Sequence, residues 1–201
     1  MVNSLIEGEV AADPLEQFRR WFAEARRAER QPDAMALATA SPDAAPSVRM
    51  VLVKSFDGRG LTFGTNFGSQ KARELEANPR AAVAFHWVDL HRQVRVAGRI
   101  ERCSEEESEA IWNERPRGAR LAAAASRQSE PITDRGALER AFAEMDARHP
   151  GDDVPRPATW GGYRLVPEAW EFWQGQENRL HDRLRYEPDG AGGWRIVRLA
   201  P

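Results

Sequence analysis

The segment RLHDR, residues 179–183, carries the densest set of side chains that could do chemistry. In an extended conformation Arg179, His181 and Arg183 project from one face of the chain, because alternate residues of a strand share a face. Three side chains that can be positive repel one another at one face unless they meet an anion or a carboxylate. The pattern therefore predicts a cationic edge suited to a phosphorylated ligand.

Three aromatic residues, Trp170, Phe172 and Trp173, come shortly before this segment. They could form a flat aromatic surface beside the cationic edge, suited to a planar ligand. The alternative is structural: a surface strand with Arg–Glu cross-strand pairs, and tryptophans in the core. Spacing alone leaves both interpretations open.

Two further segments place cations among apolar or small residues. In RMVLVK, Arg49 and Lys54 flank a run that is typical of a strand buried on both faces. They could hold an anionic ligand along the strand or lie at solvated strand ends. In GTNFGSQK, residues 64–71, Ser69 and Lys71 stand at the expected start of a helix, where exposed amides would suit a phosphate.

The composition excludes several classes of protein. The chain has 201 residues and a net charge of -2, which argues against a general nucleic-acid-binding protein. No apolar run approaches the ~20 residues of a membrane span, and the first fourteen residues lack the regions of a secretory signal. The four histidines lack HExxH spacing and Cys103 is alone, so we expect no metal site. A lone cysteine fits a reducing compartment, and we expect a cytoplasmic protein.

The elements that must position these residues follow from capping and periodicity. Asp13 and Pro14 begin one helix, and Ser104 with Glu107 forms the capping box of another that runs toward Pro116. Further helices are expected at 68–79, 117–126 and 134–149, strands at 35–40, 81–88, 92–103, 160–166, 169–174, 183–187 and 194–200, and two hairpin-connected strands within 47–66. Strands with inserted helices but no regular βαβ alternation predict an α+β fold.

The motifs, taken in order, resemble those of the pyridoxamine 5′-phosphate oxidase family from about residue 13 to residue 201. They are RMVLVK, TNFGSQKA, HRQVRVAGRIER, ERPRG, SRQS, WGGYRL, EFWQGQENRLHDR and the terminal RLAP. The resemblance implies an antiparallel FMN-binding split β-barrel with peripheral helices. It also implies a homodimer whose active sites lie at the interface. We therefore expect a flexible N-terminal segment, residues 1–12, and a single domain, residues 13–201.

The resemblance also assigns roles to individual residues. Those expected to bind FMN are Arg49, Met50, Val51, Leu52, Val53, Lys54, Gly64, Thr65, Ser69, Gln70, Lys71, Gln93, Gln128, Ser129, Trp173 and Arg183. Those expected at the substrate are Lys54, Ile111, Arg115, Ala119, Arg179 and His181. Lys54 and Arg115 would hold the substrate phosphate, and Arg179 and His181 would act as the catalytic residues at the pyridine ring.

Several positions depart from the family pattern. Ile111 stands where a tyrosine commonly donates to the substrate phosphate, and Ala119 replaces a serine with the same role. Gln70 replaces a frequent arginine, Gly64 replaces a bulkier residue, and the N-terminal segment lacks a basic, tyrosine-containing stretch. The FMN half of the expected site is therefore better supported than the substrate half.

The activity that the resemblance implies is FMN-dependent oxidation of pyridoxamine or pyridoxine 5′-phosphate to pyridoxal 5′-phosphate. Oxygen would be the acceptor and hydrogen peroxide a product, as in vitamin B6 salvage. The alternative is a related FMN-dependent oxidase with another aromatic substrate, such as a dihydrophenazine in secondary metabolism. Neither activity calls for nucleic acid or a membrane.

Overall fold

The computed structural model describes residues 4–201. Its elements are α1 (Pro14–Ala28), β1 (Ala34–Ala40), β2 (Pro46–Leu52), β3 (Ser55–Asp57), β4 (Gly60–Asn66), α2 (Gln70–Ala77), β5 (Arg80–Trp87), β6 (Arg92–Arg102), α3 (Glu105–Asn113), α4 (Arg117–Ala125), α5 (Arg135–Arg148), β7 (Trp160–Gln174), the 3-10 turn η1 (Glu177–Arg179), β8 (Asp182–Pro188) and β9 (Trp194–Arg198). No helix in this described part is long and apolar enough to span a membrane.

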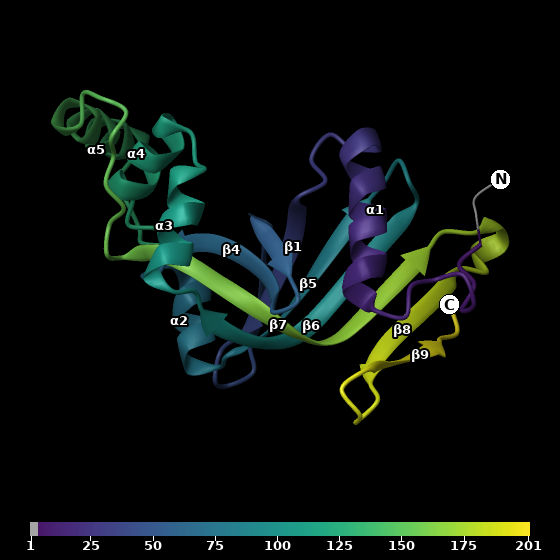
Figure 1. Cartoon of the computed structure of the whole chain (residues 1–201). Helices are drawn as coiled ribbons and strands as arrows, with labels where there is room; N and C mark the ends of the chain where they lie inside the picture. The colour runs from purple at the N-terminus through teal and green to yellow at the C-terminus, as the bar shows by residue number, and fades with distance from the viewer. Residues whose placement is uncertain (1–3) are drawn as a thin grey trace.

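One antiparallel sheet organises the molecule (Figure 1). Its strand order is β2-β1-β5-β6-β7-β4-β3, and β8 and β9 extend from β7. Strand β7 is central because its first half pairs with β4, its second half pairs with β8, and most of it pairs with β6. The sheet curls around α1, while α4 and α5 lie at one end of the molecule and β8 and β9 at the other. The α+β split-barrel prediction is thus confirmed.

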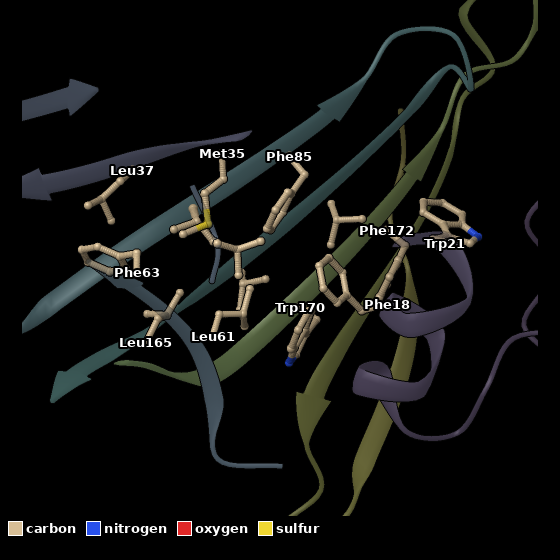
Figure 2. Packing of buried hydrophobic residues seen from close by; sticks show 14 of the residues in the cluster. Phe18, Trp21, Met35, Leu37, Leu61, Phe63, Phe85, Leu165, Trp170 and Phe172 are labelled. Carbon is tan, nitrogen blue, oxygen red and sulfur yellow. The ribbon is translucent and has the colours of Figure 1, made fainter. Parts of the chain in front are cut away.

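Helix α1 fills the concave face of the sheet. Asp13 caps it by accepting a hydrogen bond from the Leu15 amide, as the sequence predicts. Its apolar stripe is buried, and Phe18 is fully enclosed by aromatic rings that include Phe85 and Trp170 (Figure 2). The same packing fixes the curvature of β6 and β7, which carry part of the expected site.

The capping box of α3 is also confirmed, since Ser104 and Glu107 exchange hydrogen bonds with each other's backbone amides. Beneath α3, α4 and the loop before β7 lies a second apolar cluster made of Ile111, Trp112, Leu121, Val154 and Trp160. This cluster is separate from the core around α1. It supports the end of the molecule where Arg115 lies.

Three predictions about the strands are wrong. Residues 47–66 do not form two hairpin-connected strands, because β2 pairs with β1, and β4 pairs with β3 and β7. Strand β2 is also not buried on both faces: it is an edge strand on which Val48 and Met50 are 69% and 64% exposed. The two strands expected at 160–166 and 169–174 are one continuous strand, β7.

The N-terminal segment lies against the β8–β9 end of the sheet (Figure 1). Leu5 is buried, and its amide donates to the carboxylate of Asp182. The Tyr186 hydroxyl donates to the carbonyl of Ala11. The expected division into a flexible segment and a domain beginning at residue 13 stays a prediction, and residues 1–3 lie outside the described residues.

Candidate functional site

A hollow of about 520 Å³ lies between β2, the end of β4, the start of α2 and the segment after α4. Most of the residues predicted to bind FMN line it. The lining residues are Ser47, Val48, Arg49, Met50, Val51, Leu52, Lys54, Gly64, Thr65, Gln70, Lys71, Arg115, Gln128 and Ser129. The structure therefore gathers four separate parts of the sequence, namely residues 47–54, residues 64–71, Arg115 and residues 128–129.

Lys71 is a buried cation at the base of this hollow. Ser69 caps α2, so Lys71 falls in the first helical turn, where its side chain reaches back over the cap. Its Nζ atom donates to Thr65 Oγ1 at 3.1 Å, Ser69 Oγ at 3.3 Å and Gln128 Oε1 at 3.3 Å. Among the described residues no carboxylate forms an ion pair with it. Burial, together with the nearby charge of Arg49, lowers the pKa of Lys71 to about 8.

Arg49, by contrast, has an internal carboxylate partner. Its Nη2 atom lies 3.2 Å from Oε2 of Glu74, which also accepts hydrogen bonds from Thr39, Ser47 and Gln70. Burial raises the pKa of Glu74, but these hydrogen bonds outweigh it and hold that pKa at about 2. Arg49 is thus fixed in place with much of its charge compensated. Sequence reasoning missed Glu74, because its role depends on the docking of α2 against β1 and β2.

Arg115 is a second cation without an acidic partner among the described residues. Its guanidinium lies over the rings of Trp160 and Trp112, with ring-centroid distances of 5.2 and 6.0 Å. Nη2 donates to the carbonyl of Ala119 at 3.0 Å, while the buried Nε has no hydrogen-bond partner. Burial lowers the pKa of Arg115. A half-buried cation without a carboxylate partner is suited to an anionic ligand.

Four predicted residues at this end of the molecule do not line the hollow. Ile111 is buried in the second apolar cluster, and Val53 and Ser69 are also buried. Ala119 contributes only its carbonyl to Arg115. The presence of glycine at position 64 has a steric explanation, because a Cβ atom there would come within 2.6 Å of the Trp160 ring.

The other predicted residues form a second group on β6, β7 and β8. Gln93 pairs with Trp173, and Trp173 pairs with Arg183, so the three lie in one row across the sheet. His181 packs against Trp173 with ring centroids 4.7 Å apart. Arg183 forms an ion pair with Glu171 at 2.9 Å, which is the cross-strand pair that the structural alternative predicts.

Two expectations for this group are wrong. RLHDR is not an extended segment, because Arg179 lies in the turn η1 with φ of 61° and β8 begins only at Asp182. The three aromatic residues do not form one flat surface either. Trp170 and Phe172 are buried in the core, and only Trp173 lies on the opposite face beside His181.

The two groups lie apart within one chain. Thr65 of the hollow pairs with Gly161, near the start of β7, whereas Trp173 lies near its end. At ~3.3 Å per residue the intervening strand is about 40 Å long. Among the described residues, none of Gln93, Trp173, Arg179, His181 and Arg183 lines the hollow. A single chain therefore presents the predicted site residues as two separate groups.

Comparisons with known proteins agree with this geometry. Residues 22–149 match the family model described as pyridoxamine 5′-phosphate oxidase, and residues 160–201 match the C-terminal dimerisation region of pyridoxine 5′-phosphate oxidase. The pyridoxine/pyridoxamine 5′-phosphate oxidase of Rubrobacter xylanophilus is 58% identical over 198 residues, which cover 98% of this chain and 91% of that protein. The enzyme of the same name from Bordetella petrii is 53% identical, with coverages of 99% and 94%.

Among solved structures, PhzG from Burkholderia lata in complex with tetrahydrophenazine-1-carboxylic acid superposes with a TM-score of 0.92. It is 36% identical to this chain, and the match covers 100% of this chain and 99% of PhzG. An FMN-binding protein from Nostoc punctiforme, related to pyridoxamine 5′-phosphate oxidase, shares the fold at 20% identity and a TM-score of 0.75, with coverages of 96% and 100%. The extent of these matches and the family model over residues 22–149 lead to one conclusion: the chain belongs to the pyridoxamine 5′-phosphate oxidase family.

Proposed function

We propose that this chain is an FMN-dependent oxidase that converts pyridoxamine or pyridoxine 5′-phosphate to pyridoxal 5′-phosphate, with O2 as acceptor and H2O2 as product. The observation that carries the proposal is a pair of cations, the buried Lys71 and the half-buried Arg115, that line one hollow and have no acidic partner among the described residues. Two phosphate groups, one on the cofactor and one on the substrate, would satisfy both cations. The names of relatives at 52–58% identity support the same reaction.

The donor set around Lys71 fits the phosphate of FMN. Lys71 and the hydroxyls of Thr65 and Ser69 converge beside the N-terminus of α2, where backbone amides favour an anion. The edge strand β2 offers unpaired backbone groups to a flat heteroaromatic ring. When bound, FMN supplies the two-electron acceptor and the reaction with O2. The chain supplies binding, orientation and electrostatics.

Arg115 and Lys54 would bind the substrate phosphate. Arg115 lies over two tryptophan rings, where low polarity strengthens its attraction for a dianion. It has no carboxylate partner among the described residues, so its charge is available to a phosphate. Anchoring the phosphate orients the rest of the substrate toward the flavin, which accelerates a reaction between two bound partners.

Arg179 and His181 would reach the substrate from a second protomer. Within one chain they lie beyond the end of β7, far from the hollow. The match of residues 160–201 to a dimerisation region supports a homodimer that brings the two partial sites together. In that arrangement Trp173 and Arg183 of one protomer would complete the flavin site of the other.

A second candidate is oxidation of a dihydrophenazine. It is favoured by the TM-score of 0.92 to PhzG, which was solved with tetrahydrophenazine-1-carboxylic acid. Ile111 and Ala119 also provide no side-chain donor for a phosphate. Arg115 could bind a carboxylate as well as a phosphate.

The test is aerobic turnover by purified, FMN-loaded protein. Pyridoxamine 5′-phosphate, pyridoxine 5′-phosphate and a dihydrophenazine carboxylate are compared, and peroxide and the oxidised product are followed in each case. We expect pyridoxal 5′-phosphate from at least one vitamer. Flavin-loaded protein that oxidises only the dihydrophenazine would replace the proposal with the second candidate, and protein with no affinity for FMN would overturn both.

A further inference from the structure

The turn between β7 and β8 carries both residues assigned to the substrate ring. It holds two consecutive residues in left-handed backbone conformation, Asn178 with φ of 55° and Arg179 with φ of 61°. Such a conformation is unfavourable for residues other than glycine, although asparagine tolerates it. Such a conformation persists only where contacts with the surrounding structure hold the backbone in place. The bonds that anchor this turn are therefore of functional interest.

Asp182, the first residue of β8, is the main anchor. Its Oδ2 atom accepts from the Gln176 side chain at 2.8 Å and from the Leu5 amide at 3.1 Å. Its Oδ1 atom accepts from Nη1 of Arg198 at 2.7 Å. One carboxylate thus joins the turn, the N-terminal segment and β9, which lie together in Figure 1.

Arg198 strengthens this anchor from β9. Besides Asp182 it contacts both carboxylate oxygens of Glu7, at 2.7 and 2.8 Å, and donates to the carbonyl of Leu5 at 2.6 Å. Burial raises the pKa of Asp182, but its bonds to Leu5, Arg198 and Gln176 outweigh this effect and lower that pKa. Asp182 is therefore ionised near neutral pH and accepts three hydrogen bonds.

The anchored residue Gln176 in turn orients His181. The backbone N–H of Gln176 donates to Nδ1 of His181 at 3.1 Å. A ring nitrogen that accepts a hydrogen bond carries no proton, so the neutral imidazole has its proton on Nε2. The Trp173 ring packed beside it restricts the imidazole further. His181 is thereby presented as a donor through Nε2.

We propose that Asp182 is a positioning residue, which acts through Gln176 to hold His181 as the Nε2-protonated tautomer, ready to donate a hydrogen bond to an acceptor atom on the substrate ring. The role of His181 toward the substrate rests on the proposed function. The tautomer of His181 and its dependence on Asp182 do not rest on the proposed function.

The test substitutes Asp182→Asn in the FMN-loaded protein. An amide presents one acceptor and one donor where the carboxylate presents two acceptors, so at least one of the three donors loses its partner. Long-range proton–nitrogen correlation spectra of protein labelled in histidine distinguish protonated from unprotonated ring nitrogens. The signal of His181 is assigned by its loss in His181→Gln. We expect Nε2 protonation in the wild type and a mixture of tautomers in Asp182→Asn.

Turnover gives the second measurement. We expect kcat of Asp182→Asn to fall by about 10- to 100-fold, because small displacements of catalytic groups have effects of this size, while FMN affinity stays at the wild-type value. Glu187→Gln is the matched control, since it removes another carboxylate of β8 that pairs with an arginine of β9, at 2.8 Å, but does not touch the turn. The control should keep both the wild-type tautomer and kcat.

The outcomes separate this proposal from the proposed function. A folded Asp182→Asn protein that keeps the wild-type tautomer and kcat overturns the role of Asp182. If that variant does not fold, Gln176→Met is used instead, because it removes the same hydrogen bond between Gln176 and Asp182. An unchanged His181 tautomer in Gln176→Met would also overturn the role of Asp182. A wild type that oxidises no vitamer, but whose His181 tautomer depends on Asp182, would refute the proposed function and support the positioning role.

Discussion

Lys71→Met should stabilise the flavin-free protein while removing much of its affinity for FMN. Lys71 is 7% exposed and is surrounded by neutral oxygens of Thr65, Ser69 and Gln128. Without an anion, its charge is held in an environment that solvates it less well than water does. Methionine has a similar length and no charge, so it removes this unfavourable burial together with the contact to a phosphate.

The magnitude follows from the pKa. The pKa of Lys71 falls from 10.5 to about 8, and each pKa unit corresponds to about 1.4 kcal/mol, so the buried charge destabilises the flavin-free protein by about 3 kcal/mol at neutral pH. Methionine leaves the three oxygen acceptors without this donor, at a cost of about 1–2 kcal/mol. The expected net gain is about 1–2 kcal/mol, or a Tm increase of about 2–8 °C for a chain of this size.

The buried charge of Lys71 should also make the free energy of unfolding depend on pH. Between pH 8 and 10.5 the unfolded wild type holds more protons on Lys71 than the folded protein does, because the folded pKa is the lower one. The free energy of unfolding of the wild type therefore rises with pH in this window. Lys71→Met lacks this rise, so its stability advantage should shrink as pH increases from 8 to 10.5. Other titrating groups are common to both proteins and cancel in the difference.

The assay is urea unfolding of flavin-free wild type and variant at fixed protein concentration from pH 7 to 10.5, with FMN titration of both at pH 7. Loss of a charge-assisted hydrogen bond, about 1.5–3 kcal/mol, predicts FMN binding weaker by about 10- to 100-fold. Arg73→Met, which removes an exposed cation from the same helix, is the control and should change neither quantity. A variant less stable than the wild type at pH 7, or one with unchanged FMN affinity, would refute the reasoning.

Three further predictions concern other parts of the molecule. Arg179→Ala should reduce kcat by about 100-fold or more and leave FMN affinity nearly unchanged, and steady-state kinetics with flavin titration will check this. Ile111→Tyr should lower stability by about 1–3 kcal/mol in urea unfolding, because Ile111 packs against Gly64 and Gly162 and the larger ring overfills that space. Phe18→Ala should destabilise the protein by about 3–5 kcal/mol in the same assay, since Phe18 is fully buried among aromatic rings.

The sequence predicts best those features that depend on neighbouring residues. The caps at Asp13 and Ser104 involve bonds within three residues, and both appear where the sequence places them. The strand expected at 92–103 is also confirmed as β6, with Val94 and Val96 buried and Arg95 exposed. Each of these features is decided locally, so a single sequence is enough to recognise it.

Features that depend on distant pairing were missed. The partner of β2 is β1 rather than β4, which no local pattern specifies. The left-handed conformation of Arg179 interrupts the extended conformation expected for RLHDR. Asp182, which anchors this turn, is itself bound by Leu5 and Arg198 at the two ends of the chain. The split of the aromatic residues could have been predicted, because Trp170 and Trp173 are an odd number of residues apart and so face opposite sides of a strand.

Charge pairing also explains why a chain with a net charge of -2 can present a cationic site. Arg49 is compensated by Glu74, and Arg183 by Glu171, so these arginines are held in place before any ligand binds. Lys71 and Arg115 have no such partner among the described residues, and both have lowered pKa values because of burial. Withdrawing one cation fully and the other partly from water is unfavourable for the flavin-free protein, but it concentrates positive charge where two phosphates would bind. The ligands would then complete the ion pairs that the folded chain lacks, so binding of the cofactor and folding stability should increase together.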